Sequence, residues 1–280
     1  MLLGEGRLRL AMARWWRAPE IGNVLPSWKM APATGALLKL EQGGSFWYAD
    51  QPLAVPWPNA PLPARSVLQC IPFDVHAFDD ARFADAGIDC PPHIAHSAHK
   101  RKAHYFYGRL CAHEALKQLG CAGAVGCGAT RVPVWPEGVV GSITHSHALA
   151  AAVVAPASLC RGVGIDVEEV VTPEVWDALR HSVVSPAEYD LLQVLAGRTD
   201  LGTLLTLVFS AKESFFKASF SAVGRYFDFD ALVLRDIDFE RSELIFVLSV
   251  SLCAEWLLGQ EVRITYQQSL FGCVATLCVW

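Results

Sequence analysis

The C-terminal part of the chain alternates apolar and polar residues with the period of two that is typical of half-buried strands. The runs ALVLRDIDF, ELIFVLSVSL and VRITYQQSL show this alternation at residues 231–239, 243–252 and 262–270. They predict antiparallel strands. Shorter apolar runs predict further strands at residues 66–75, 142–145, 149–154 and 162–170.

Helical patterns lie between these strands. Residues 91–120 predict one or two helices that end at Gly120, and residues 172–195 predict a helical segment with a break at Ser185 and Pro186. Residues 203–224 predict another helical segment, with a new start at Ser210. Helices mixed with antiparallel strands in this way predict an α+β fold.

Composition limits the classes of protein that the chain can be. It has 280 residues, of which 52% are hydrophobic and 18% charged, with a net charge of -5. This balance lacks the basic excess of a sequence-independent nucleic-acid binder, so we expect no nucleic-acid partner. No apolar run reaches the roughly 18 residues that a membrane-spanning helix needs. The first residues lack a secretory signal pattern, and we expect a cytoplasmic protein with no membrane partner.

Two carboxylates stand where a buried strand would carry apolar residues. Asp166 and Glu168 in GVGIDVEEV are two positions apart and therefore lie on one face of the predicted strand. Adjacent like charges repel unless one carboxylate takes a proton or a cation lies between them. Taken alone, the pair is also consistent with an exposed edge strand.

A second charged pair lies in the run FSAKESFFKA. Glu213 and Lys217 are four residues apart, so a helix places them on one face. A local alternative is a capping box of Ser210 and Glu213 followed by a surface ion pair. Together with Asp166 and Glu168, however, Glu213 completes a set of oxygen ligands suited to Mg²⁺ that shares its remaining positions with phosphates. The set indicates metal-assisted phosphoryl-type transfer.

These two runs resemble the paired signature of the 4′-phosphopantetheinyl transferases, G-(I/V)-D-x-E followed by (F/W)-S-x-K-E-(A/S)-x-x-K, and every defined position matches. Upstream, HKRKAHYFYGRL and PVWPEGVVGSITH resemble two further segments of the siderophore-synthase and surfactin-type branch. His104, Tyr105 and Thr144 stand where that branch usually has Glu, Phe and Ser. The order of the four segments is also that of the family.

The resemblance implies two similar α/β halves related by a pseudo-twofold axis, with coenzyme A bound between them. It places the N-terminal, nucleotide-binding half at residues 66–160 and the half with the metal and catalytic motifs at residues 161–280. Residues 1–65 form an N-terminal extension of unknown role, with a proline-rich, linker-like stretch from Pro52 to Ala64. One site per chain is implied, so we expect a monomer.

The resemblance also implies roles for single residues. Asp166, Glu168 and Glu213 would bind Mg²⁺, with Mn²⁺ as an alternative. Contacts with coenzyme A, the co-substrate, are implied for a mostly basic set: Arg101, Arg109, Arg131, Thr144, His145, Lys212 and Lys217.

The implied reaction moves 4′-phosphopantetheine from coenzyme A to a serine hydroxyl of an apo acyl or peptidyl carrier protein. Glu213 or a metal-bound water would take the serine proton, and Lys217 would stabilise the charge on the departing 3′,5′-ADP. The aromatic residues Phe215, Phe216 and Tyr226 are candidates for the surface that the carrier protein contacts.

Two other classes use similar residues. A metal-dependent nuclease would also cluster carboxylates near a lysine, but it commonly needs a broad basic surface that the net charge of -5 does not favour. A binding module for coenzyme A or carrier proteins would not require the intact set of Asp166, Glu168, Glu213 and Lys217. Turnover of coenzyme A to 3′,5′-ADP discriminates between the three classes.

Overall fold

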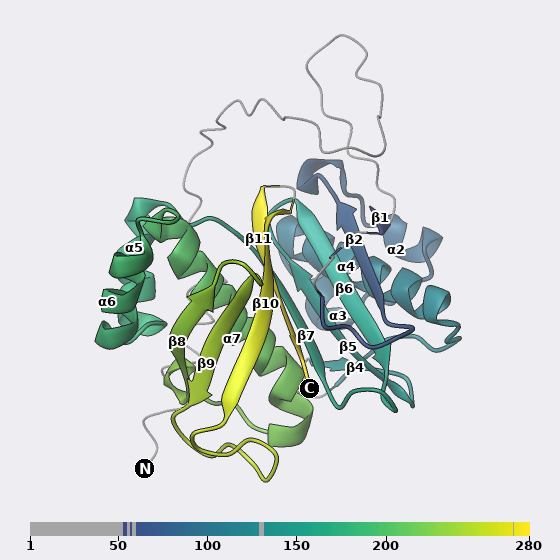
Figure 1. Cartoon of the computed structure of the whole chain (residues 1–280). Coiled ribbons are helices and arrows are strands. Elements are labelled where there is room, and N and C mark those ends of the chain that lie inside the picture. The colour runs from purple at the N-terminus through teal and green to yellow at the C-terminus, as the bar shows by residue number, and fades with distance from the viewer. Residues whose placement is uncertain (1–52, 55–56, 58–59, 129–131, 271) are drawn as a thin grey trace. The chain divides into compact units, whose positions relative to one another are not determined.

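The computed structural model describes residues 53–54, 57, 60–128, 132–270 and 272–280 (Figure 1). Almost all of the predicted N-terminal extension, residues 1–65, lies outside this description, and so does Arg131. The domain boundaries expected from the sequence therefore stay a prediction. None of the helices in the described ranges combines the length and the apolar character needed to cross a lipid bilayer.

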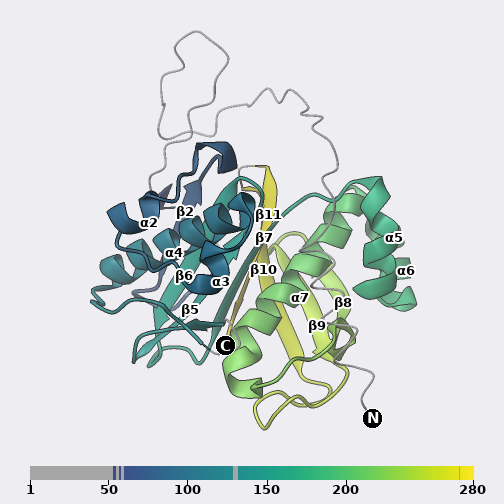
Figure 2. The ribbon, with the colours of Figure 1, turned by 180° about the vertical axis from the view of Figure 1, so that it is seen from behind.

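The N-terminal half packs a long helix against an antiparallel sheet. The sheet has the order β1-β2-β6-β5, and α4 (His99–Leu119) covers one of its faces (Figure 2). Its strands are β1 (Leu53–Ala54), β2 (Val67–Pro72), β5 (Val139–His145) and β6 (Leu149–Pro156). Smaller elements are the 3-10 helix η1 (Val75–Ala77), α2 (Arg82–Asp85), α3 (Pro92–Ala95), and the pair β3 (Gly126–Cys127) and β4 (Pro133–Val134).

The C-terminal half repeats this arrangement. A second antiparallel sheet has the order β7-β11-β10-β9-β8, and α7 (Leu201–Val223) packs on its β7 and β11 strands (Figure 2). The strands are β7 (Val163–Glu169), β8 (Leu232–Asp238), β9 (Glu243–Leu248), β10 (Glu261–Leu270) and β11 (Cys273–Val279). Two helices, α5 (Pro173–Ser182) and α6 (Pro186–Leu195), precede α7, and the 3-10 helix η2 (Phe229–Ala231) follows it. The α+β fold predicted from the sequence is confirmed.

Two expectations about these elements need correction or addition. The predicted helix start at Ser210 is wrong, because α7 is continuous and begins after Asp200, whose side chain accepts a hydrogen bond from the Thr203 amide at 2.8 Å. The hydroxyl of Ser210 instead lies 2.9 Å from that of Thr276 on β11. The run CVATLCV, which forms β11, is apolar almost throughout and shows no alternation, so the sequence pattern did not single it out.

The two sheets meet where β5 lies beside β7. Alternate residues of β5 turn their hydroxyl groups toward β7: Ser142 Oγ accepts from the Ile165 amide at 3.1 Å, and Thr144 Oγ1 accepts from the Val167 amide at 3.3 Å. The buried amides of Ile165 and Val167 on β7 therefore donate to side-chain oxygens of β5, because no backbone carbonyl of β5 pairs with them. Buried amides need such partners. β7 therefore contacts β5 of the first sheet and α7 of the C-terminal half.

Two glycines allow α7 to approach β7 closely. A β-carbon at Gly164 would lie 1.9 Å from the carbonyl oxygen of Ser214, and one at Gly162 would lie 2.1 Å from that of Ala218. No real side-chain carbon tolerates such distances from a helix backbone. The glycines of GVGIDVEE therefore bring the helix onto the strand face that carries Asp166, two residues after Gly164.

We predict that Gly164→Ala lowers the free energy of unfolding by about 1–3 kcal/mol or more, because the added methyl group forces α7 away from β7. Urea unfolding followed by circular dichroism measures this. Gly197→Ala is the matched control, since nothing lies within 4 Å of a β-carbon there. Equal stability of the two variants would contradict the close approach of α7 and β7.

Candidate functional site

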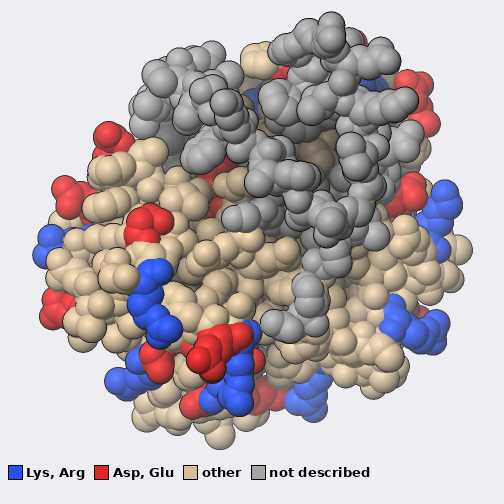
Figure 3. All heavy atoms as spheres, turned by 45° about the horizontal axis from the view of Figure 1, so that its top comes forward, with Lys and Arg blue, Asp and Glu red and all other residues tan. Residues whose placement is uncertain are grey.

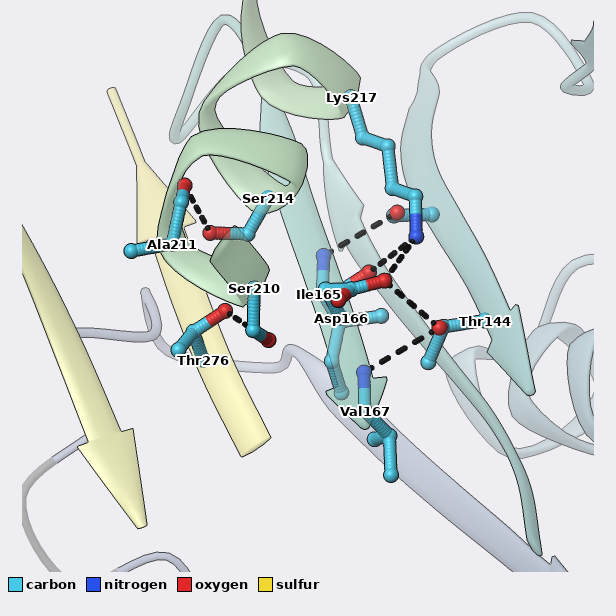
Figure 4. Close-up of polar contacts among 10 residues, drawn as sticks. Thr144, Ile165, Asp166, Val167, Ser210, Ala211, Ser214, Lys217 and Thr276 are labelled. Carbon is cyan, nitrogen blue, oxygen red and sulfur yellow. Dashed lines mark hydrogen bonds and ion pairs between the residues drawn. The ribbon is translucent and has the colours of Figure 1, made fainter. Parts of the chain in front are cut away.

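The centre of the site is an ion pair between β7 and α7. Lys217 Nζ lies 2.6 Å from Asp166 Oδ1 and donates a second hydrogen bond to the Ile165 carbonyl at 3.2 Å (Figure 4). Asp166 is buried and Lys217 is about one quarter exposed. Lys217 therefore reaches across to a strand far away in the sequence, which a purely local helix pair with Glu213 would not require.

Thr144 holds the other side of the Asp166 carboxylate. Its hydroxyl donates to Asp166 Oδ1 at 3.1 Å while it accepts from the Val167 amide (Figure 4). The sequence predicted Thr144 as a contact of coenzyme A, and the structure shows this additional bond to a carboxylate. Asp166 is thus oriented from both halves of the molecule.

The remaining two carboxylates lie in the same electrostatic environment. Burial raises the pKa of Glu213 to about 7, with a further increase from Asp166 and an opposing effect of Lys217. The pKa of Glu168 is raised well above its usual range by burial and then by the neighbouring Asp166. Burial alone would lower the pKa of Lys217, but Asp166 and Glu213 outweigh it and raise the value. The ammonium group of Lys217 thus stabilises the ionised carboxylates, whereas burial disfavours their negative charge.

These carboxylates fit a divalent cation without forming a complete site for it. Within the described ranges, no group of three or more His, Cys, Asp or Glu side chains is arranged as a metal-binding set. Asp166 Oδ2, however, is buried and lacks a hydrogen-bond partner, which is costly for a carboxylate oxygen. Together with the raised pKa values of Glu168 and Glu213, this oxygen indicates a place where a cation would be favourable.

Histidine and arginine side chains border the site on the N-terminal half. The rings of His104 on α4 and His145 at the end of β5 are 4.5 Å apart. Burial lowers the pKa of His145 to about 4, and the positive charges of Lys217 and Arg101 contribute. Both charges act on one ring, so Lys217 and Arg101 create a positive potential beside the carboxylates, and the neutral ring of His145 lies within it.

Arg109 ties α4 to the start of β3. Its guanidinium group is buried and lies 5.1 Å from the centre of the Tyr105 ring. Its Nη1 donates to the carbonyls of Val125 at 2.7 Å and Gly126 at 2.9 Å. The contact with coenzyme A that the resemblance implies for Arg109 stays a prediction.

The position of Lys212 does not fit its predicted contact with coenzyme A. Its ammonium group is almost fully buried and lies 2.8 Å from Glu188 Oε1 on α6. Adjacent residues of a helix point about 100° apart, so Lys212 faces the interior of the C-terminal half while Glu213 faces the site. The sequence alone missed Glu188, although Ser185 and Glu188 form a capping box that the S-x-x-E spacing would have revealed.

The comparisons with known proteins agree with this geometry. A model of the 4′-phosphopantetheinyl transferase N-terminal domain matches residues 91–155, and one of the 4′-phosphopantetheinyl transferase superfamily matches residues 162–267. The chain belongs to this superfamily, as the resemblance of its four segments predicted. It is therefore an enzyme of the 4′-phosphopantetheinyl transferase class.

Three relatives illustrate the similarity. Enterobactin synthase component D of Escherichia coli O157:H7 is 38% identical over 157 residues, which are 53% of this chain and 73% of the relative. The 4′-phosphopantetheinyl transferase Svp of Streptomyces mobaraensis is 37% identical over 159 residues, 55% of this chain and 64% of the relative. The transferase Npt of Nocardia iowensis is 38% identical over 138 residues, 49% of this chain and 60% of the relative.

We predict that Glu213→Gln stabilises the metal-free protein much more at pH 8 than at pH 5. A carboxyl group whose folded pKa is raised to about 7 gives stability that is present below its unfolded pKa and lost as the pH rises through 7. The glutamine variant is neutral throughout, so its advantage in unfolding free energy should reach about 1–3 kcal/mol at pH 8.

Urea titrations at the two pH values, with a chelator present, test this expectation. Glu169→Gln serves as the control, because Glu169 is exposed at the end of β7, the strand that carries Asp166 and Glu168. An advantage of Glu213→Gln that is the same at pH 5 and pH 8 would show that Glu213 does not titrate as the site geometry requires.

Proposed function

We propose that this enzyme transfers the 4′-phosphopantetheine group of coenzyme A to a serine hydroxyl of an apo acyl or peptidyl carrier protein and releases 3′,5′-ADP. The observation that carries this proposal is the junction of β7 and α7, where Asp166, Glu213 and Lys217 lie together beside a basic border from the N-terminal half. A pyrophosphate substrate requires carboxylates that bind a cation and positively charged side chains that bind the phosphates.

The phosphates of coenzyme A would bind between the halves. Arg101 and His145 from the N-terminal half and Lys217 from α7 are the donors that we assign to them. Thr144 and Lys217 already hold Asp166 Oδ1, so they would fix that carboxylate while the substrate binds. Arg131, which the sequence predicts as a further contact, lies outside the described residues. Lys212 is buried against Glu188 and leaves this set, whereas Arg109, whose Nη1 donates to the Val125 carbonyl, stays a predicted contact.

The residues that would hold Mg²⁺, or Mn²⁺ in its place, are Asp166, Glu168 and Glu213. Bound there, the cation would offset the repulsion among the carboxylates and neutralise charge on the pyrophosphate oxygens. Asp166 can contribute Oδ2, which has no partner among the described residues. The donor set consists of carboxylate oxygens, the ligand type that these hard cations prefer.

The transfer step can be assigned to groups of the chain. The serine oxygen of the carrier protein forms a bond to the β-phosphorus, and the bond from that phosphorus to the bridging oxygen of 3′,5′-ADP breaks. We assign Glu213 as the group of the chain that takes the serine proton. With coenzyme A bound, Lys217 Nζ would face the phosphates and stabilise the negative charge that develops on the leaving oxygen.

The surface charge does not favour the nuclease alternative. On the face shown in Figure 3, lysine and arginine side chains are scattered among acidic ones, and the described residues of that face form no continuous basic area. A nuclease that binds the backbone of a nucleic acid commonly needs such an area. Local phosphate binding by Arg101, His145 and Lys217 suits a small pyrophosphate substrate better.

The carrier protein would dock at the C-terminal end of α7. Tyr226 is 41% exposed and stacks on the ring of Phe216 at 5.5 Å, so these two residues offer an aromatic surface close to Lys217. Phe215, the third aromatic residue expected there, is fully buried against Trp256 and belongs to the core. Of the three aromatic residues predicted for the carrier-protein surface, we therefore keep Phe216 and Tyr226.

Incubation with Mg²⁺, coenzyme A and a panel of apo carrier proteins tests the proposed reaction directly. We expect the carrier serine to gain the mass of one 4′-phosphopantetheine group and 3′,5′-ADP to appear in equal amount. The reaction should stop when a chelator removes the metal. Cleavage of coenzyme A without any mass gain on a carrier would contradict the transferase assignment.

Lys217→Met separates the catalytic role of this lysine from a structural one, because methionine keeps the stem and deletes the charge. We expect kcat to fall ~10²-fold or more, since a preorganised charge at the leaving group is lost. The thermal midpoint should fall as well, because Asp166 loses its partner in a buried position. A normal kcat in the folded variant would remove Lys217 from the transfer step.

A further inference from the structure

A second buried ion pair holds α7 from the side opposite the site. Lys212 Nζ lies 2.8 Å from Glu188 Oε1 and donates to the Val183 carbonyl at 2.9 Å. Both side chains are about 1% exposed. Burial lowers the pKa of Lys212, and the Glu188 carboxylate opposes this change.

Glu188 connects Lys212 to two further elements. Its Oε2 accepts from the Ser185 amide at 2.7 Å, which closes the capping box at the start of α6. Its Oε1 also accepts from the Leu234 amide at 2.8 Å, on the edge strand β8 beside the register shift between Leu234 and Asp236. Every charged oxygen of the pair is thus satisfied, as a stable buried ion pair requires.

The positions of the two lysines on α7 give this pair a consequence for the site. Five residues of an α-helix span about 500°, so Lys217 lies about 140° around the helix from Lys212. One lysine is held by the α6 and β8 side, and the other is held by Asp166 on β7. Two polar anchors on nearly opposite faces define how far the helix is rotated about its own axis.

We propose that Lys212 and Glu188 are positioning residues for the transfer step. Their ion pair fixes the rotation of α7, so that Glu213, the residue next to Lys212, faces the site and Lys217 reaches Asp166. This inference rests on the proposed function of Glu213 and Lys217. It assigns Lys212 no contact with the substrate.

The test compares Lys212→Met, Glu188→Gln and the double variant with the wild-type enzyme. The double variant removes both charges and keeps similar volumes, so it should fold even where Lys212→Met alone leaves a buried carboxylate unpaired. In the double variant we expect kcat to fall about 10-fold to 100-fold, as small misplacements of catalytic groups do. The KM for coenzyme A should stay within about threefold, because Arg101 and His145 lie on the other half.

Arg263→Met is the matched control. It breaks an exposed ion pair with Glu243 on the strands β10 and β9, 3.1 Å long, and should leave both kcat and KM unchanged. A folded double variant with normal kcat would overturn the positioning role. A raised KM with normal kcat would also overturn it, since Lys212 would then contact coenzyme A.

A second measurement keeps this inference separate from the proposed function. Lys217→Met is introduced into both the wild type and the double variant, and its shift in thermal midpoint is compared without substrate. We expect a smaller shift in the double variant, because Lys217 no longer reaches Asp166 well when α7 can rotate. Equal shifts would overturn the positioning role even if wild-type protein transferred nothing to any carrier.

Discussion

The rest of the site depends on the close packing of α7 on β7. Because Gly162 and Gly164 have no side chains, the backbone of α7 approaches β7 closely. Glu213 and Lys217, one turn apart on α7, then lie near the face of β7 that carries Asp166. Lys217 then completes the contact at 2.6 Å. A larger residue at position 164 would push α7 away from β7, and the ion pair between Lys217 and Asp166 would be lost.

This packing creates a site with more negative groups than positive ones. Lys217 offsets part of the charge of Asp166, and the raised pKa values of Glu168 and Glu213 show that the site favours protons or another cation. Such a balance is unfavourable for an isolated protein and favourable for one that binds a cation together with a phosphate-bearing substrate.

The local part of this site could be predicted from the sequence. The period of a strand places Asp166 beside Glu168, and the period of a helix places Glu213 one turn from Lys217. Which face of α7 meets β7 could not be predicted, because Lys212 and Glu213 are neighbours and only tertiary packing decides that one faces the core and the other the site. Arg109 shows the same limit, since its carbonyl partners at Val125 and Gly126 lie at the start of the two-residue strand β3, where the sequence has no periodic pattern.

The junction of the two sheets explains why a hydroxyl, rather than a particular residue, is needed at position 144. Thr144 Oγ1 accepts from the Val167 amide and donates to Asp166 Oδ1, so one group joins the edge of one sheet to the face of the other that carries Asp166. A serine hydroxyl could make both bonds, whereas the additional methyl group of threonine restricts the rotation about χ1. Threonine therefore keeps the hydroxyl chemistry of the family pattern and orients the carboxylate more rigidly, so that a strand of the N-terminal sheet fixes the geometry of Asp166 in the C-terminal sheet.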